Sequence, residues 1–325
     1  MCGVLYSTNE MSEQPPERLK IREALREATD ALRAARINDA RLDARLLLSD
    51  LLARPHAFLI AHSEDELDAA SLALFRERIR RRAQGEPVQY ITGRQEFYGL
   101  DFEVNPAVLI PRPETELLVE TALELLRDRQ APLLCDVGTG SGCIPVALLH
   151  ERPDARACAL DISPAALAVA ARNAARHGVS ERLTFSVSDC FDALDESDAT
   201  EATGATDAAG ANGGARRFQL ITSNPPYIAE SEMPGLQREV REHEPRIALT
   251  PGGDGLSIIR RLLAGAPRHI AEGGHFIFEI GHDQHEPVVR LIDENIWTLI
   301  RIRPDLQGLP RVVVLERRRQ PRANE

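Results

Sequence analysis

The sequence predicts an α/β protein in which an open parallel sheet, covered by helices, follows a small helical bundle. Three observations predict this fold. Apolar residues recur at helical spacing over the first ninety residues, a two-residue period replaces it near residue 95, and strand and helix patterns then alternate toward the end of the chain. Such alternation is typical of parallel sheets that are connected by covering helices.

The composition fits a protein of two domains and disfavours several classes of function. The 325 residues are 43% hydrophobic and 27% charged, which is enough for more than one core. A formal net charge of −11 creates no overall positive field, so a nucleic acid is disfavoured as the main partner. No apolar run reaches the roughly 20 residues that cross a bilayer, and we expect a cytoplasmic protein without membrane contacts. The five cysteines, odd in number and without CxxC spacing, predict neither disulfides nor a metal site.

The first predicted domain is a helical bundle over residues 17–92. Residues 1–16 lack periodicity, and we expect a disordered tail there. Amphipathic stretches joined by short connections then predict helices over residues 18–35, 40–53 and 67–84. The second of these stretches has an apolar stripe made of Leu42, Leu46, Leu47 and Leu51.

A hairpin and a sheet domain follow the bundle. Gly99 separates two stretches of two-residue period, which predicts a β-hairpin within a linker over residues 93–113. The sheet domain, over residues 114–318, contains apolar runs of strand character at 133–137, 156–160, 183–187, 218–223, 275–280, 297–302 and 311–315. Residues 195–215 are mostly Ala, Thr, Gly and Asp, so we expect a disordered insertion there.

A glycine-rich turn follows the first strand of the sheet domain. Its sequence is Gly138-Thr139-Gly140-Ser141-Gly142, and glycines let the backbone approach a ligand closely. Cys143 stands where the dinucleotide fingerprint requires its third glycine, which favours a smaller nucleoside ligand. About 20 residues later Asp161 ends the next strand, where an acidic side chain accepts both ribose hydroxyls.

The tetrapeptide Asn224-Pro225-Pro226-Tyr227 follows a later strand at its carboxyl end, where open α/β sheets bind ligands. Proline fixes its own φ and has no N–H, so the Asn224 and Pro225 carbonyls are rigidly aimed. The Asn224 side-chain oxygen and the Pro225 carbonyl can accept both hydrogens of a planar NH2 group and turn its lone pair toward an electrophilic methyl. We expect the Tyr227 ring to stack on that planar group.

Together the two motifs predict an S-adenosylmethionine-dependent methyltransferase that acts on a planar NH2 nitrogen. Asp136 would hold the ammonium of the methionine part or support the glycine turn. Asp189 and Cys190, at the end of the third strand, would lie beside the adenine ring, with Asp189 accepting from its amino group. An amide and an adenine are both acceptors that fit the tetrapeptide.

The chain resembles the release factor glutamine methyltransferases, the HemK or PrmC family, over residues 18–317. Besides the glycine turn, the resemblance is carried by Gly85-Glu86-Pro87, Gln89-Tyr90-Ile91-Thr92-Gly93, Glu96-Phe97-Tyr98, Leu109-Ile110-Pro111-Arg112-Pro113-Glu114-Thr115-Glu116 and Ser223-Asn224-Pro225-Pro226-Tyr227-Ile228. It implies a class I methyltransferase fold, Rossmann-like, with a seven-stranded, mostly parallel sheet whose last strand is antiparallel. It also implies an N-terminal helical bundle that binds the release factor, joined by a β-hairpin.

The resemblance further implies the substrate and the site. The substrate is the glutamine of the Gly-Gly-Gln motif of bacterial peptide chain release factors, methylated at its side-chain nitrogen N5. The glycine turn, Asp161, the Cys190 position and Asn224 would contact S-adenosylmethionine, and residues 224–227 would hold the glutamine. Arg112 and Glu114 are candidates for contact with the substrate. Family members often have an aromatic residue where this chain has Cys190, so we expect a backbone contact with adenine there.

Two other acceptors compete with the release factor. A related enzyme methylates a glutamine of a large-subunit ribosomal protein, but the segment 113–116 favours the release-factor branch. An adenine-N6 methyltransferase uses a similar tetrapeptide, yet the acidic net charge and the lack of a basic recognition module argue against it. We therefore expect a monomer with a protein substrate and without nucleic-acid specificity.

Overall fold

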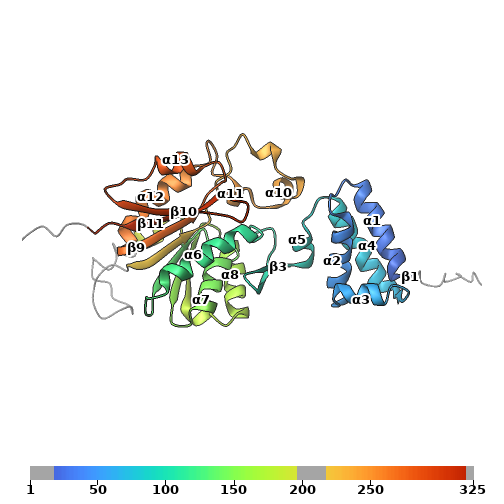
Figure 1. Ribbon diagram of the computed structural model, residues 1–325. Helices are drawn as coiled ribbons and strands as arrows, with labels where there is room; N and C mark the ends of the chain where they lie inside the picture. Colours follow the sequence, from blue (N-terminus) through green and yellow to red (C-terminus); the bar gives the residue numbers. More distant parts are fainter. Residues whose placement is uncertain (1–17, 196–216, 320–325) are drawn as a thin grey trace, which may run out of the picture. The chain divides into compact units, whose positions relative to one another are not determined.

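The computed structural model describes residues 18–195 and 217–319 (Figure 1). The tail expected at residues 1–16 lies outside these ranges, as does the insertion expected at 195–215 except for Asp195. The chain divides into two compact units between Thr92 and Gly93. The first unit is helical, and the second contains a seven-stranded sheet.

Helices α1 to α5 make up most of the first unit. Their bounds are α1 Ile21–Ala34, α2 Ala40–Leu52, α3 His56–Ala61, α4 Ala69–Ala83 and α5 Val88–Thr92, and β1 Leu19–Lys20 pairs antiparallel with β2 Glu66–Leu67. The stripe predicted for α2 is half right: Leu47 is fully buried and Leu51 packs against the core, but Leu42 and Leu46 are 54% and 46% exposed. The small residues Ala40 and Ala44 complete the buried face in their place.

The second unit begins with a hairpin of β3 Arg94–Phe97 and β4 Leu100–Glu103. Tyr98 and Gly99 form its turn with φ of 54° and 73°. The fully buried Asn173 side chain fixes β4: its Oδ1 accepts from the Glu103 N–H at 2.7 Å, and its Nδ2 donates to the Glu103 carbonyl at 3.0 Å. The same Nδ2 donates to the Ser141 carbonyl at 2.9 Å. One side chain therefore ties the hairpin to the glycine turn.

The sheet contains seven strands in the order β7-β6-β5-β8-β9-β11-β10. Their bounds are β5 Leu133–Val137, β6 Arg156–Asp161, β7 Leu183–Val187, β8 Phe218–Ser223, β9 Ile270–Glu279, β10 Trp297–Pro304 and β11 Pro310–Arg317. Strands β5 to β9 pair in parallel, and β11 is antiparallel to both β9 and β10. This arrangement confirms the predicted class I methyltransferase fold. The strand order reverses between β5 and β8, and such switch points place ligands at the carboxyl ends of the strands.

Helices cover both faces of the sheet (Figure 1). The helical segments are η1 Pro113–Thr115, α6 Glu116–Leu126, α7 Cys143–Glu151, α8 Pro164–Arg176, η2 Ser180–Arg182, η3 Met233–Gly235, α10 Arg238–His243, α11 Arg246–Leu249, α12 Ser257–His269 and α13 His285–Val289. Successive strand residues alternate between two cores: Leu134 packs with α6 and α7, and Cys135 packs with α12. None of the described helices is long and apolar enough to cross a membrane.

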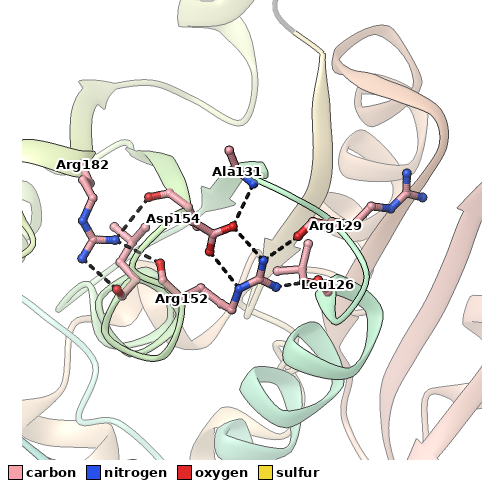
Figure 2. A network of polar contacts seen from close by, with 8 residues as sticks. Leu126, Arg129, Ala131, Arg152, Asp154 and Arg182 are labelled. Atoms are coloured by element: carbon pink, nitrogen blue, oxygen red, sulfur yellow. Dashed lines mark hydrogen bonds and ion pairs between the residues drawn. The ribbon is translucent and has the colours of Figure 1, made fainter.

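Two arginines organise the amino ends of β5, β6 and β7 (Figure 2). Arg152 donates to the carbonyls of Leu126 and Arg129 and pairs with Asp154, whose Oδ2 accepts from the Ala131 N–H at 2.8 Å. The Arg182 guanidinium donates to three carbonyls between the last turn of α7 and the start of β6, those of Leu149, Arg152 and Ala155, at 2.9 to 3.2 Å. This network lies at the end of the strands opposite to the one where ligands are expected.

Candidate active site

A cavity of about 310 Å³ lies at the carboxyl ends of β5, β6, β7 and β8. It is lined by residues 107–109, 111–112, 115, 137–141, 143–144, 161–163, 166, 188–190, 223–226, 245, 247–248, 250–251, 258 and 261–262. The predicted site residues on this lining are Arg112, Gly138, Thr139, Gly140, Ser141, Asp161, Asp189, Cys190, Asn224, Pro225 and Pro226. Those that are not part of it are Glu114, Asp136, Gly142 and Tyr227.

The three glycines of the turn have φ values of 75°, 54° and 78°, in the left-handed region. A Cβ at Gly138 or Gly140 would meet nothing within 4 Å, so the backbone is open to a ligand at both positions. A Cβ at Gly142 would lie 3.0 Å from the Ala170 Cβ. Gly142 therefore serves the close packing of α8, while the first two glycines serve the cavity.

Asp161 fastens the glycine turn and also lines the cavity. Its Oδ2 accepts from the Gly140 N–H at 2.8 Å, and its Oδ1 accepts from the Ser163 N–H at 2.9 Å. Burial raises the pKa of this carboxyl, and the two backbone N–H groups oppose that effect. Each oxygen keeps lone-pair capacity for a further donor, so the arrangement suits a ligand that offers two hydroxyls.

Asp136 lies buried beneath the turn. Its Oδ1 accepts from the Thr222 hydroxyl at 2.6 Å, while its Oδ2 has no hydrogen-bond partner. Burial raises the pKa of Asp136 to about 6. The buried Thr139 hydroxyl of the turn, on the cavity lining, is close enough to Asp136 to oppose this rise in pKa. Of the two roles expected for Asp136, these contacts favour support of the glycine turn.

Asp189 and Cys190 reach the cavity from the end of β7. The Asp189 Oδ1 pairs with Nη1 of Arg261 on α12 at 2.8 Å, a partner that the sequence did not suggest. Cys190 has a φ of 56°, and its carbonyl accepts from the Ser188 hydroxyl at 2.9 Å. Burial raises the pKa of the Cys190 thiol to about 11, so the side chain is a neutral part of the lining.

Asn224 and Pro225 present two acceptors without donors. The Asn224 Nδ2 donates to the Thr115 Oγ1 at 3.0 Å. Within the described ranges, no residue donates a hydrogen bond to the Asn224 Oδ1 or to the Pro225 carbonyl. Because both residues line the cavity, they fit the expected acceptor pair for an NH2 group.

The contacts of Tyr227 differ from the expected stacking. Its hydroxyl donates to Glu279 Oε1 at 3.2 Å, and its carbonyl accepts from the Gln284 Nε2 at 2.7 Å. The ring packs against the core on the α12 side of the sheet and is absent from the cavity lining. These contacts hold the turn that carries Asn224, and they do not point the ring at an acceptor group as expected.

The segment before α6 brings one of its two candidate residues to the cavity. Arg112 lines the cavity and pairs with Glu244 at 2.5 Å. The buried Glu244 also accepts from the Ile110 N–H at 3.1 Å, so it joins the segment to the end of α10. Glu114 is half-buried outside the lining. Glu116 accepts from the Tyr98 N–H at 2.9 Å, which gives it a role in the hairpin turn.

Sequence reasoning missed Thr115, Glu244, Arg261 and Glu279 as parts of this site. An acid at the end of an otherwise apolar strand was the one available signal, and it applied to Glu279. In the described ranges, no group of three or more His, Cys, Asp and Glu side chains is arranged to hold a metal ion.

Comparisons with known proteins bear on both units. The PrmC N-terminal domain model matches residues 23–93, and the precorrin methyltransferase domain model matches residues 118–215. A ribosomal protein L11 methylase of Lactobacillus delbrueckii subsp. bulgaricus has a similar structure, with a TM-score of 0.44 and 18% identity over 66% of this chain and 84% of that chain. A likeness this distant bears on neither substrate nor site.

Relatives of known name match nearly the whole chain. The release factor glutamine methyltransferase of Koribacter versatilis is 43% identical over 296 residues, which cover 91% of this chain and 98% of that protein. Those of Nitratidesulfovibrio vulgaris and Burkholderia pseudomallei are 42% and 43% identical, over 90% and 87% of this chain and 94% of each relative. The chain belongs to the release factor glutamine methyltransferase family.

Proposed function

We propose that this enzyme transfers the methyl group of S-adenosylmethionine to the side-chain nitrogen N5 of the glutamine in a release factor's Gly-Gly-Gln motif. The observation that carries the proposal is the pair of unengaged acceptors, Asn224 Oδ1 and the Pro225 carbonyl, on the lining of the cavity that also contains the glycine turn. The family of the relatives supplies the acceptor protein.

The residues of the cavity fit S-adenosylmethionine. The open backbone at Gly138 and Gly140 admits a ligand, and Asp161 can accept from two ribose hydroxyls. The backbone of Cys190 is available for the adenine, and the Thr139 hydroxyl on the lining offers a further polar contact. When bound, S-adenosylmethionine supplies an electrophilic methyl group on a sulfonium.

The chemistry left to the protein is to make an amide nitrogen nucleophilic. The lone pair of an amide nitrogen is delocalised into the carbonyl. Asn224 Oδ1 and the Pro225 carbonyl accept one hydrogen bond each from its two N–H groups and turn the lone pair toward the methyl group. Holding two reactants in line can lower a barrier by roughly 7 to 11 kcal/mol. No strong base has to remove a proton before transfer: the methylated nitrogen loses one of its two protons to solvent afterwards, and the other product would be S-adenosyl-L-homocysteine.

The remaining parts of the chain serve the protein substrate in this proposal. Arg112, on the cavity lining, contacts the residues beside the glutamine. The unit before Gly93 binds the body of the release factor, as the match to the PrmC N-terminal domain suggests. In this proposal the enzyme acts in the cytoplasm, since its substrate belongs to translation, and it acts as a monomer.

The test is transfer of labelled methyl from S-adenosylmethionine by the full chain. The acceptors are a release factor, the same factor with its Gly-Gly-Gln glutamine changed to alanine, a large-subunit ribosomal protein, and DNA. Label on the unaltered release factor alone supports the proposal. Label on the altered factor would show that this glutamine is not the methylated residue. Label on the ribosomal protein or on DNA instead would identify a different acceptor.

A further inference from the structure

A buried chain of hydrogen bonds runs behind the acceptor pair. Asn224 Nδ2 donates to Thr115 Oγ1 at 3.0 Å, Thr115 Oγ1 donates to Glu279 Oε2 at 2.7 Å, and the Tyr227 hydroxyl donates to Glu279 Oε1 at 3.2 Å. Thr115 and Glu279 are only 2% and 1% exposed. Burial leaves Thr115 and Glu279 little access to water, and in such a site each polar group depends on its neighbours.

The direction of the Thr115 hydrogen bond determines what Asn224 can present. An ionised carboxylate only accepts, and a hydroxyl has one proton. Because the Thr115 hydroxyl donates its one hydrogen bond to Glu279, it can offer Asn224 only lone pairs. The NH2 end of the Asn224 amide must therefore face Thr115, and its oxygen is left for the cavity.

The carboxylate of Glu279 is held in place from two sides. Its second oxygen is engaged by Tyr227, whose own carbonyl is held by Gln284. Glu279 also ends β9, one residue after the Phe278 that pairs with Ser223 of β8. The sheet thus sets the carboxylate beside the tetrapeptide, where it cannot turn away from Thr115 without leaving Tyr227.

Burial, hydrogen bonds and two nearby charges act on the pKa of this carboxyl. Burial raises the pKa of Glu279, and the negative charge of Glu114 acts in the same direction. The Thr115 and Tyr227 hydrogen bonds and the positive charge of Arg311 oppose the rise and favour the ionised form.

We propose that Glu279 is a positioning residue that acts through Thr115 to orient the Asn224 amide, so that Oδ1 rather than Nδ2 meets the NH2 group of the substrate. The inference rests on the proposed function, because only a substrate that donates hydrogens needs an acceptor there. A reversed amide would present its own N–H groups to those of the substrate, and the nitrogen would lose one of its two acceptors.

Glu279→Gln tests the direction of these hydrogen bonds while the side chain at position 279 keeps nearly the same volume. A glutamine amide can donate to Thr115, which lets the hydroxyl turn its proton toward Asn224 and stabilises the reversed amide. We expect kcat for release-factor methylation to fall on the order of 100-fold, as for the loss of one preorganised group at a reacting centre. The Kd for S-adenosylmethionine should change less than about twofold, because the glycine turn and Asp161 are untouched.

Thr115 provides the second set of variants. Thr115→Val removes the hydroxyl and should lower kcat to a similar degree, while Thr115→Ser restores the hydroxyl and should recover most of that loss. The control is Thr121→Val on α6: Thr121 is also fully buried, and its hydroxyl donates to the Leu117 carbonyl and accepts from Arg303 Nη1 at 3.0 Å, but neither partner belongs to the site. Its kcat should stay within about twofold of the unaltered enzyme.

The outcomes separate this inference from the proposed function. If the unaltered enzyme does not methylate a release factor, the proposed function fails. If it does, and Glu279→Gln and Thr115→Val retain kcat within twofold, the positioning role is overturned. Equal losses in kcat and in S-adenosylmethionine affinity, without recovery by Thr115→Ser, would also overturn it, because Glu279 would then only hold the fold. Should Glu279→Gln not fold, the comparison of valine and serine at position 115 decides.

Discussion

Asp136→Asn should stabilise the sheet unit, and the gain should depend on pH. Asp136 is fully buried, one of its oxygens has no partner, and burial raises its pKa to about 6. The folded protein binds this proton more tightly than the unfolded chain, in which the ordinary value of 3.8 applies. Ionisation of Asp136 therefore opposes folding. This effect is complete well above pH 6 and is lost as the pH falls toward 3.8.

The magnitude follows from the two pKa values. The difference between about 6 and 3.8 corresponds to about 3 kcal/mol at roughly 1.4 kcal/mol for each pKa unit. By linkage, the cost of ionising Asp136 is about 3 kcal/mol at pH 8 and about 1 kcal/mol at pH 4.5. Asparagine has no such cost, and its oxygen can still accept from Thr222. The advantage of the variant should therefore shrink by about 2 kcal/mol between the two pH values.

Urea unfolding followed by tryptophan fluorescence measures this difference. Trp297 is the only tryptophan of the chain and is 1% exposed in the sheet unit, so it reports on the unit that contains Asp136. Asp128→Asn, at an exposed position, is the control and should change the free energy of unfolding by less than about 0.5 kcal/mol at either pH. An advantage of Asp136→Asn that is equal at pH 8 and pH 4.5, or larger at pH 4.5, would refute the reasoning.

Three further variants test the site and the fold. Asp161→Ala should weaken S-adenosylmethionine binding by about 1.5 to 3 kcal/mol, the usual worth of hydrogen bonds to a charged group; unchanged affinity in calorimetry would remove Asp161 from the site. Asn224→Ala should lower kcat on the order of 100-fold with little change in S-adenosylmethionine affinity, and an equally active variant would contradict the acceptor role. Arg182→Met removes three hydrogen bonds to carbonyls between the last turn of α7 and the start of β6 and should lower the free energy of unfolding by about 1 to 2 kcal/mol, measured through Trp297. The exposed Arg127→Met serves as its control, and equal effects of the two would rule out a special role for Arg182.

The fold was largely predictable because its strands are local patterns. Buried parallel strands form short apolar runs, and each of the seven runs in the sheet domain overlaps a strand. The helices of the first unit were harder to predict. Helix α2 turns its alanines inward and leaves Leu42 and Leu46 exposed, so hydrophobicity alone located only the Leu47 and Leu51 part of the buried face. Helices α3 and α5 span only six and five residues, which is too short for a clear helical period.

The candidate site was predictable where one short segment carries the chemistry. The glycine turn and the tetrapeptide are such segments, and both lie on the cavity lining. The contacts behind them join residues that are far apart in sequence: Asn224 meets Thr115 at a separation of 109 residues, and Thr115 meets Glu279 at 164. A single sequence gives the types of the residues in such a series of hydrogen bonds, but not which of them pair. For the same reason Tyr227 was expected to face the substrate, although its hydroxyl is engaged by Glu279.

Two buried carboxylates flank the strand that precedes the tetrapeptide, and each accepts a hydrogen bond from a threonine hydroxyl. Asp136 on β5 accepts from Thr222 of β8, and Glu279 at the end of β9 accepts from Thr115. Burial raises the pKa of both carboxyls, which means that both oppose folding when ionised. An apolar residue at either position would avoid that cost, but it could not dictate the direction of a hydroxyl. Direction is what a methyltransferase acting on an amide requires, since Asn224 is useful only with its oxygen toward the cavity. The arrangement is therefore understood better as orientation of the site at the expense of stability than as a stabilising core.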